Sequence, residues 1–476
     1  MKFKEIPKGP YDSKPPKFGK NAKKLFSLDP SFIALNHGSW GAPPTFITEI
    51  QRYWQTQAER NPDLHYRFQL RSLMDNARSV IGKIFGLNTP EQLKSLVFCQ
   101  NTSMAVNSVL RSLIPLFCRG YRPQPFTLEL VKPYSNPPQQ AHPTQTCSSR
   151  PCILHFSTLF SAVHETLLFL NSIHPEFNPI QIKLTYPIND DSILKILSDT
   201  IASYPPQSIC LVILDAISSK PGVLFPFQKV IRYCRDLHLP TLLDGAHAAG
   251  QIDIHLPSIH PTFFVTNLHK WMYAPRGCAI LYISPHYESI IHPAVVSYGY
   301  SRGCQEEFSW IGTQDYSAFI TAAEVIQFRE WLGGESVIQN YTHSLAVEGG
   351  QLLSRMFQTK VMENDSNSLT ASMVNILLPV SVSSSYRVCA SDDNENIQRD
   401  DHDHNQNDVF MKSIGEILIT KYNAYATVYY HHHEWWLRVS AQIYNDLDDF
   451  QRLGEYILEI LSTKSIIMKE HCTSKL

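Results

Sequence analysis

The clearest pattern of apolar and polar positions lies between about residues 208 and 283. Ile209 to Leu214 is an unbroken apolar run, which is typical of a strand buried on both faces. The apolar residues that follow recur at helical spacing: Phe227, Val230, Ile231, Cys234 and Leu237. Thr241 to Leu243 is the next buried run, so the order predicts a parallel strand–helix–strand crossover. Ligands in such sheets bind at the carboxyl ends of the strands, where Asp215 and Asp244 stand.

Similar patterns occur earlier in the chain. Phe32 to Leu35 predicts a short strand that leads into a tight, irregular loop, residues 36–41. Leu96 to Phe98 predicts a buried strand, and apolar residues at helical spacing between Ala105 and Leu113 predict the helix after it.

The last hundred residues indicate a second unit of mixed composition. Met373 to Val382 and Ala424 to Tyr430 predict strands, and Asp448 to Leu461 predicts a helix. The chain is therefore expected to be α/β, with a large domain built on a mainly parallel sheet, residues 31–315, and a smaller C-terminal α+β domain, residues 316–476.

Three segments lack this patterning. A Lys/Pro-rich leader, residues 1–30, is expected to be flexible. Residues 116–151 are polar and rich in proline, which indicates a surface insertion in the large domain. Residues 389–408 are acidic, rich in amides and almost free of apolar side chains, so a disordered loop is expected there.

Composition narrows the class of protein. The 476 residues exceed the size at which one core stops growing, and 43% of them are hydrophobic, enough for two domains. The formal net charge of −2 gives no basis for binding nucleic acid or an anionic membrane. Ten cysteines without CxxC spacing and an opening segment without an apolar run predict reduced thiols and no secretion. No apolar run approaches the roughly 20 residues that span a bilayer.

The chemistry concentrates between Thr241 and Ile283. Asp244 directly follows a buried strand, where a carboxylate is costly unless a cation accompanies it. Lys270 follows His269 in a turn between two apolar segments, an environment that lowers the pKa of an amine and allows it to form an imine. Arg438 lies in an apolar strand, where a guanidinium requires an anion.

Six ordered motifs carry a resemblance to a known family: NHGSWG (36–41), DAISSKPG (215–222), LLDGAHAAGQ (242–251), TNLHKWMYAPRG (266–277), WIGTQDYSA (310–318) and LRVSAQIYN (437–445). The chain resembles the class V aminotransferases, pyridoxal 5'-phosphate (PLP) enzymes of fold type I. Within that family it is similar to the branch of isopenicillin N epimerase-like proteins, L-cysteine desulfhydrases and hercynylcysteine sulfoxide lyases. The resemblance covers about residues 30–114, 152–380 and 410–460.

The resemblance implies a role for each matching residue. Lys270 would form the covalent link to PLP, Asp244 would support the pyridine nitrogen, and His247 would lie near the phenolic oxygen. The other residues implied to bind the cofactor are Thr102, Ser103 and His269 at the phosphate, Asp215, and Phe160 stacked on the ring. Thr313 would reach the phosphate of a neighbouring subunit, which implies a homodimer.

The implied substrate is a small amino acid. Arg438 would bind its α-carboxylate, and Asn36 and His37 would border the same pocket. Two positions depart from the pattern: Ala216 stands where many relatives have His, and Gln314 stands where many have Arg. These departures loosen any transfer of substrate preference.

The favoured reaction is β-elimination of sulfur from L-cysteine or a cysteine conjugate, a C–S lyase activity. Cysteine desulfuration needs a mobile thiol, for which Cys389 is a candidate, although the carboxylates of Asp392 and Asp393 would raise its pKa. Epimerisation remains an alternative, and transamination is less favoured. A non-enzymatic metal-binding or interaction protein is the rival outside this class, suggested by His402, His404 and the run His431 to His433.

The final residues Ser474-Lys475-Leu476 match a peroxisomal import signal. Peroxisomal import through its receptor is therefore expected, with a cytoplasmic location as the alternative.

Overall fold

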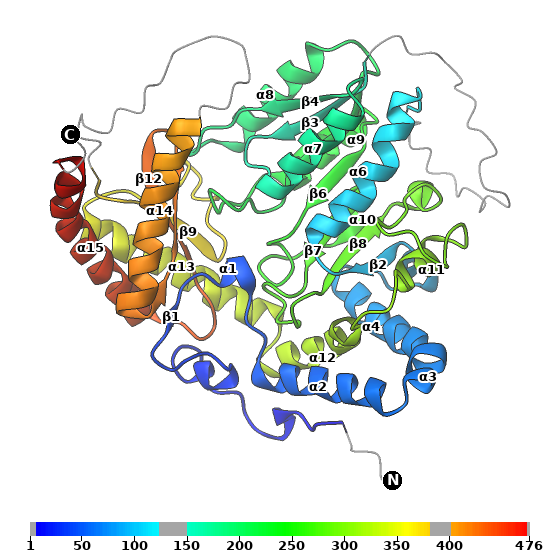
Figure 1. Cartoon of the computed structure of the whole chain (residues 1–476), viewed down its shortest axis with the longest axis horizontal. Helices are drawn as coiled ribbons and strands as arrows, with labels where there is room; N and C mark the ends of the chain where they lie inside the picture. Colours follow the sequence, from blue (N-terminus) through cyan, green and yellow to red (C-terminus); the bar gives the residue numbers. More distant parts are fainter. Residues whose placement is uncertain (1–5, 123–149, 381–400, 474–476) are drawn as a thin grey trace.

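A seven-stranded sheet forms the centre of the large domain (Figure 1). The computed structural model describes residues 6–122, 150–380 and 401–473, except for the side chains of 401–411 and 463–473. In sheet order the strands are β2 (Leu96–Cys99), β8 (Ala279–Ile283), β7 (Phe263–Asn267), β6 (Thr241–Asp244), β5 (Ile209–Asp215), β3 (Cys152–Phe156) and β4 (Asn178–Ile182). Strands β7, β6, β5, β3 and β4 are parallel to one another, and β8 is antiparallel to both β7 and β2. The predicted crossover through β5 and β6 is confirmed.

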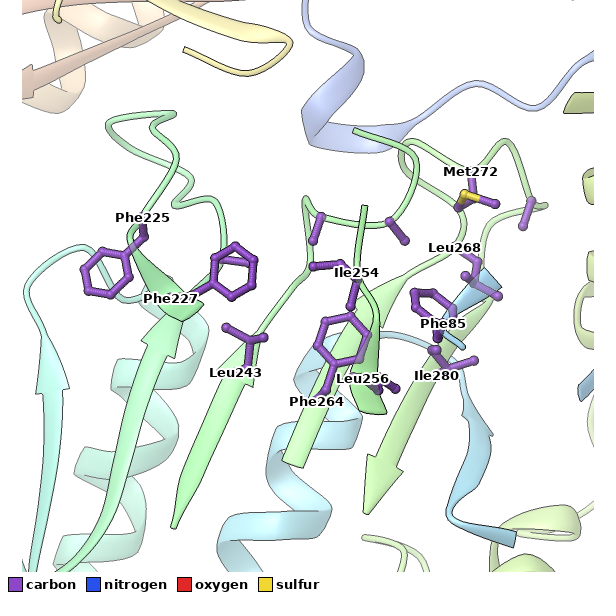
Figure 2. Packing of buried hydrophobic residues seen from close by; sticks show 14 of the residues in the cluster. Phe85, Phe225, Phe227, Leu243, Ile254, Leu256, Phe264, Leu268, Met272 and Ile280 are labelled. Atoms are coloured by element: carbon purple, nitrogen blue, oxygen red, sulfur yellow. The ribbon is translucent and has the colours of Figure 1, made fainter. Parts of the chain in front are cut away.

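Both faces of the sheet are buried because alternate residues of each strand point to opposite sides. Val212 and Leu214 of β5 join one apolar cluster, whereas Leu211 and Ile213 join another. Figure 2 shows the first cluster, in which Phe264 packs with residues from several neighbouring strands and loops. The continuous apolar runs of the sequence are explained by this double burial.

Helices cover each face. One face is covered by α6 (Thr102–Cys118), α7 (Ser161–Ile173) and α11 (Cys304–Ser309). The opposite face is covered by α4 (Leu70–Ile84), α8 (Asp190–Ala202), α9 (Phe227–Asp236), α10 (Leu256–Ile259) and α12 (Ser317–Trp331). Helix α12 also packs against α2 (Thr45–Arg60). The short helices α3 (Pro62–Leu64) and α5 (Pro90–Lys94) and the π-helical turn η3 (His65–Gln69) lie near α4.

The smaller domain packs three long helices on a short antiparallel sheet. The sheet order is β11 (Thr427–His431), β12 (Glu434–Ser440) and β9 (Met373–Leu377). The helices are α13 (Glu335–Phe357), α14 (Asp401–Tyr422) and α15 (Leu447–Thr473). The predicted C-terminal α+β domain is confirmed, and Figure 1 shows it beside the large domain.

The leader does not behave as predicted over residues 6–30. It contains the 3-10 turns η1 (Pro10–Asp12) and η2 (Ala22–Leu25), and its Phe26 side chain is buried in the core. The backbone N–H of Gly19 donates to the carbonyl of Ile443 at 2.7 Å. The sequence did not reveal this packing, because the segment is rich in lysine and proline and only a few of its apolar side chains anchor it.

The start of the chain also belongs with its end. Strand β1 (Ile33–Ala34) pairs in parallel with β10 (Ala424–Tyr425), so these residues extend the smaller domain rather than the large one. The predicted large domain, residues 31–315, included these residues, which pair instead with a strand of the predicted C-terminal domain. A two-residue strand carries too little pattern to reveal a partner 391 residues later, as with Ile33 and Ala424.

The other unpatterned segments are described only in part. Residues 401–408 of the predicted acidic loop are the first two turns of α14. The buried Ile414 and Leu418 anchor the helix farther along, and helix growth is cooperative, so it extends into polar sequence. Residues 389–400, most of the proline-rich insertion and Ser474–Leu476 lie outside the described residues, so the import signal stays a prediction. None of the described helices combines the length and the apolar character needed to span a membrane.

Candidate active site

A cavity of about 250 Å³ opens at the carboxyl ends of β5, β6 and β7. Its lining combines acidic, basic and aromatic side chains with the first residues of α6. The lining residues are Ser39, Trp40, Asn101, Thr102, Ser103, Phe160, Asp215, Ile217, Ser219, Asp244, Ala246, His247, Asn267, His269, Lys270 and Arg276. Eight residues predicted from the sequence are among them: Lys270, Asp244, His247, Thr102, Ser103, His269, Phe160 and Asp215.

Lys270 projects into the cavity from the turn between β7 and β8. Its Nζ lies 3.2 Å from Nε2 of His247. Burial lowers the pKa of the amine to about 8, although the nearby Asp244 carboxylate acts in the opposite direction. At pH 7 about a tenth of the amine is therefore unprotonated, against well under a thousandth at the ordinary pKa of 10.5, so a nucleophile is available.

Asp244 and Asp215 end neighbouring strands and are paired in register. Both carboxyl groups are buried, and Asp244 accepts a hydrogen bond from the backbone N–H of Ala246 at 2.9 Å. Thr158 donates its hydroxyl to Asp215 at 3.1 Å. Burial raises the pKa of both carboxyls, and the charge of Asp244 raises that of Asp215 further. The pair therefore favours a ligand that brings positive charge, such as a protonated pyridine ring.

The far side of the cavity offers an anion-binding helix terminus. Asn101 caps α6 by accepting a hydrogen bond from the N–H of Met104 at 2.9 Å. Thr102 is held by Asn267, to which its backbone N–H donates at 3.1 Å. Ser103 lines the cavity at the first turn of this 17-residue helix, where the dipole and the free N–H groups favour a phosphate.

His269 completes this end of the cavity. Its Nδ1 donates to the carbonyl of Cys278 at 2.8 Å, and Nε2 is left for a ligand. Burial lowers the pKa of the ring to about 4, so Nε2 carries no proton in the empty cavity. A phosphate beside it would favour the protonated ring, which then acts as the expected donor.

Arg438 reaches the cavity rim from β12. Its Nη1 donates to the carbonyl of Ser219 at 2.7 Å, and its Nη2 donates to Asn36 Oδ1 and Ser39 Oγ, each at 2.9 Å. Burial lowers the pKa of the guanidinium to about 10, and its Nε has no hydrogen-bond partner. Among the described residues no carboxylate pairs with it, because Glu434 lies beside Lys360 instead. A buried, uncompensated cation of this kind suits a carboxylate ligand.

The two other predicted substrate residues act differently from expectation. Asn36 orients Arg438 and also accepts hydrogen bonds from Ser39 and Thr427, both at 2.8 Å. His37, like Asn36 and Arg438, is not among the residues that line the cavity. Its Nε2 donates to the carbonyl of Lys270 at 2.8 Å, and its Nδ1 accepts from the Tyr444 hydroxyl at 2.9 Å. One ring nitrogen thus holds the backbone of the lysine, and the other is held by Tyr444.

The remaining predicted positions separate into two groups. Phe160 stands at the N-cap position of α7, is 41% exposed and lines the cavity, as a stacking role requires. Thr313 is exposed and lies outside the cavity of its own chain, so its role toward a neighbouring subunit stays a prediction. The two departures are accommodated: Ala216 is fully buried, and Gln314 accepts a hydrogen bond from Gln100 at 2.8 Å.

The histidine run has a structural role in the described residues. His432 and His433 have positive φ angles and turn the chain between β11 and β12. His431 Nε2 accepts a hydrogen bond from the backbone N–H of Tyr186 at 3.0 Å. The side chains of His402 and His404 lie outside the description, as does Cys389. None of the described cysteines lines the cavity.

Several site residues were missed by the sequence argument although they stand inside the quoted motifs. Asn267 fixes the start of α6, Ser39 and Ser219 hold Arg438, and Arg276 donates to the carbonyls of Trp40 and Gly41. Their motif positions were the available signal, but a polar residue in a loop does not reveal what it touches.

Gly41 shows why one motif glycine is needed. Its φ is +64°, and a Cβ at this position would lie 1.9 Å from the carbonyl oxygen of His269. The NHGSWG loop therefore passes against the Lys270 turn with no room for a side chain.

The family model described as Aminotransferase class-V matches residues 182–453. The chain belongs to the class-V aminotransferase family. That match includes Asp244 and Lys270, which line the cavity, and Arg438, which is hydrogen-bonded to the lining residue Ser219.

Two curated relatives extend the comparison. The chain is 26% identical over 372 residues to the hercynylcysteine sulfoxide lyase of Schizosaccharomyces pombe, covering 76% of this chain and 84% of that protein. It is 26% identical over 441 residues to the L-cysteine desulfhydrase of Arabidopsis thaliana, covering 90% of this chain and 87% of that one.

A solved structure confirms the fold type. A C-DES mutant with glycine covalently linked to its PLP cofactor superimposes with a TM-score of 0.66 at 14% identity. The similarity covers 91% of this chain and 98% of that one. The class-V family implies PLP as the cofactor here, and the cavity fits it: a buried acidic pair for the ring nitrogen, an amine for attachment and a helix N-terminus for the phosphate.

Proposed function

We propose that the protein is a PLP-dependent C–S lyase that removes sulfur from L-cysteine or a cysteine conjugate by β-elimination. The observation that carries this reaction is the composition of the cavity. An amine and a buried acidic pair line it, a buried arginine is hydrogen-bonded to two of its lining serines, and no described cysteine lines it to receive sulfur. The names of the two relatives, one a sulfoxide lyase and one a desulfhydrase, support the same reaction.

Each residue has a task in this reaction. Arg438 would bind the α-carboxylate of the amino acid, because its partners fix the guanidinium at the cavity rim. Lys270 would attach the cofactor and then remove the Cα proton. Asp244 would keep the ring nitrogen protonated, and His247 would donate toward the phenolic oxygen. PLP, when bound, draws electron density away from Cα.

The products follow from the balance of bonds. The Cα proton moves to Lys270, the Cβ–S bond breaks, and the electron pair leaves with sulfur. Hydrolysis of the resulting enamine releases pyruvate and ammonia. One L-cysteine and one water thus give one sulfide, one pyruvate and one ammonia, without an external oxidant or reductant.

The rivals within the family give different products. A desulfurase would leave alanine and a persulfide on a cysteine of the protein, and an epimerase would give the D-amino acid without sulfide. Incubating the PLP-loaded protein with L-cysteine and with a cysteine sulfoxide conjugate distinguishes them. Equal amounts of pyruvate and released sulfur product are expected, and alanine or the D-isomer as main product would overturn the proposal.

Two variants make the experiment decisive. Lys270→Ala is expected to abolish turnover and the visible absorbance of the attached cofactor, because one amine carries both the link and the proton transfer. Cys389→Ala is expected to leave sulfide production unchanged. Loss of activity in this second variant alone would favour a persulfide mechanism.

We further propose that the active form is a homodimer. The exposed apolar segment 295–300 supports this, since Tyr298 is 83% exposed and Val296 60% exposed, and the exposed Thr313 is available to a second copy. Tyr298→Asp should shift the sedimentation profile from dimer to monomer and weaken cofactor binding. A wild-type monomer with full cofactor affinity would contradict the proposal.

A further inference from the structure

Trp271 follows the cofactor lysine and is only 1% exposed. Its indole Nε1–H lies 3.3 Å from Nδ1 of His247. The opposite nitrogen of the same imidazole, Nε2, lies 3.2 Å from Nζ of Lys270. The three side chains of Trp271, His247 and Lys270 are therefore linked in a row that ends at the reactive amine.

The indole can only donate, and this fixes the donor and the acceptor in each of the two contacts. An indole nitrogen donates and never accepts, so Nδ1 of His247 has to be the accepting nitrogen. In a neutral imidazole the proton then resides on Nε2. Burial, together with the nearby cations Lys270 and Arg438, lowers the pKa of His247 and keeps the ring neutral.

The consequence appears at the lysine. Nε2–H of His247 can only donate, and an unprotonated amine can accept this hydrogen bond whereas an ammonium group cannot. We propose that Trp271 is a positioning residue that fixes the tautomer of His247, so that the imidazole donates to Lys270 and favours the unprotonated amine that attaches the cofactor. This holds whichever bond of the substrate is later broken.

The indole is held firmly in place. It packs with Ile217, Ala371 and Met373 in a small apolar cluster, and its ring centroid lies 5.2 Å from that of His37. Arg329 donates to the carbonyl of Trp271 at 2.9 Å. Rotation of the indole away from His247 would disturb its contacts with this cluster and with His37, while Arg329 holds its backbone in place.

The other charged and titratable groups around Lys270 act in both directions. The Asp244 carboxylate at the end of β6 favours the protonated amine, whereas Arg438 of β12 disfavours it. His269 precedes the lysine and is neutral, and His37 contacts only its backbone carbonyl. The Trp271–His247 pair is the element that can be altered without changing any of these charges.

The test uses the protein without PLP, so it does not depend on turnover. Histidine ¹⁵N NMR should show His247 protonated on Nε2 in the wild type. The rate at which added PLP attaches to Lys270 should be followed against pH. In Trp271→Phe the midpoint of this profile is expected to rise by about one pH unit, the size of shift that one hydrogen-bonding partner typically gives.

Two further variants separate positioning from packing. Trp436→Phe is the matched control. It removes an indole that is as buried as that of Trp271 but whose Nε1 has no hydrogen-bond partner, so the profile should stay unchanged. His247→Gln provides a side chain that donates without a tautomer. Adding Trp271→Phe to that background should have no further effect on the midpoint.

The outcomes that overturn the proposal are equally concrete. Protonation of Nδ1 in wild-type His247 would do so by itself, even if Trp271→Phe fails to fold. The same midpoint shift with and without His247 would show that the indole acts only by packing.

Discussion

The substrate-anchoring role of Arg438 is tested by Arg438→Lys. The guanidinium presents two separate nitrogens to four neighbours, and these contacts fix its plane: Ser219, Asn36, Ser39 and Thr427. Lysine preserves the charge but has one nitrogen, so it cannot form the planar pair of hydrogen bonds with a carboxylate. The change should therefore affect substrate binding much more than folding.

The magnitude follows from the burial of the site. Losing one partner of a buried charge-assisted pair costs about 2–5 kcal/mol, and the retained charge favours the lower half of that range. At about 1.4 kcal/mol for each factor of ten, kcat/KM should fall roughly 30- to 300-fold. The acceptors left behind remain partly satisfied, because Asn36 still receives hydrogen bonds from Ser39 and Thr427. The free energy of unfolding should thus fall by no more than about 1–2 kcal/mol.

The assay pairs kinetics with denaturation. Inhibition by L-alanine and by ethylamine, which lacks the carboxylate, is compared in the wild type and in Arg438→Lys. The preference for L-alanine should largely disappear in the variant, and Glu434→Gln should preserve it because Glu434 lies beside Lys360. A large loss of stability with an unchanged preference for L-alanine would refute the anchoring role.

Three further predictions concern the same cavity. Asp244→Asn should retain PLP but lose several orders of magnitude in kcat, and a near-normal rate would mean that another group supports the ring nitrogen. Asp215 has a raised pKa in the folded protein without PLP, so its contribution to stability is greatest below the unfolded pKa of about 3.9 and declines as pH rises toward the folded pKa. The melting temperature of Asp215→Asn should therefore rise relative to that of the wild type as pH increases above about 4. The same dependence of melting temperature on pH in both proteins would refute this. Gly41→Ala should weaken PLP retention, because a Cβ would collide with the His269 carbonyl. Retention is measured as the loss of cofactor absorbance from the protein during equilibrium dialysis, and unchanged retention would show that the loop can move.

The sheet and the reactive lysine were predictable because their signals are local. Unbroken apolar runs such as Ile209 to Leu214 are typical of strands buried on both faces, Asp244 ends one such strand, and Lys270 lies in the turn after another. Arg438 was predictable for the same reason, since its strand is apolar on either side of it.

What escaped prediction depends on contacts between distant segments. His37 was placed at the substrate because it stands in a motif, but its ring nitrogens bind Lys270 and Tyr444, whose positions no local pattern reveals. The leader was misjudged because its packing depends on Phe26 and a few backbone hydrogen bonds. The start of α14 was misjudged because a helix anchored by Ile414 continues beyond its apolar half.

The pairing of β1 with β10 determines the order in which parts of the protein can assemble during synthesis. Asn36 leaves the ribosome 402 residues before Arg438, the side chain that it orients. At about 5–20 residues per second, the early segment waits roughly 20–80 s for its partner. During that interval the apolar side chains of Ile33 and Leu35 have no core to join and stay exposed in the nascent chain. The contact between Asn36 and Arg438 is therefore one of the last to form, although Asn36 is among the first residues made.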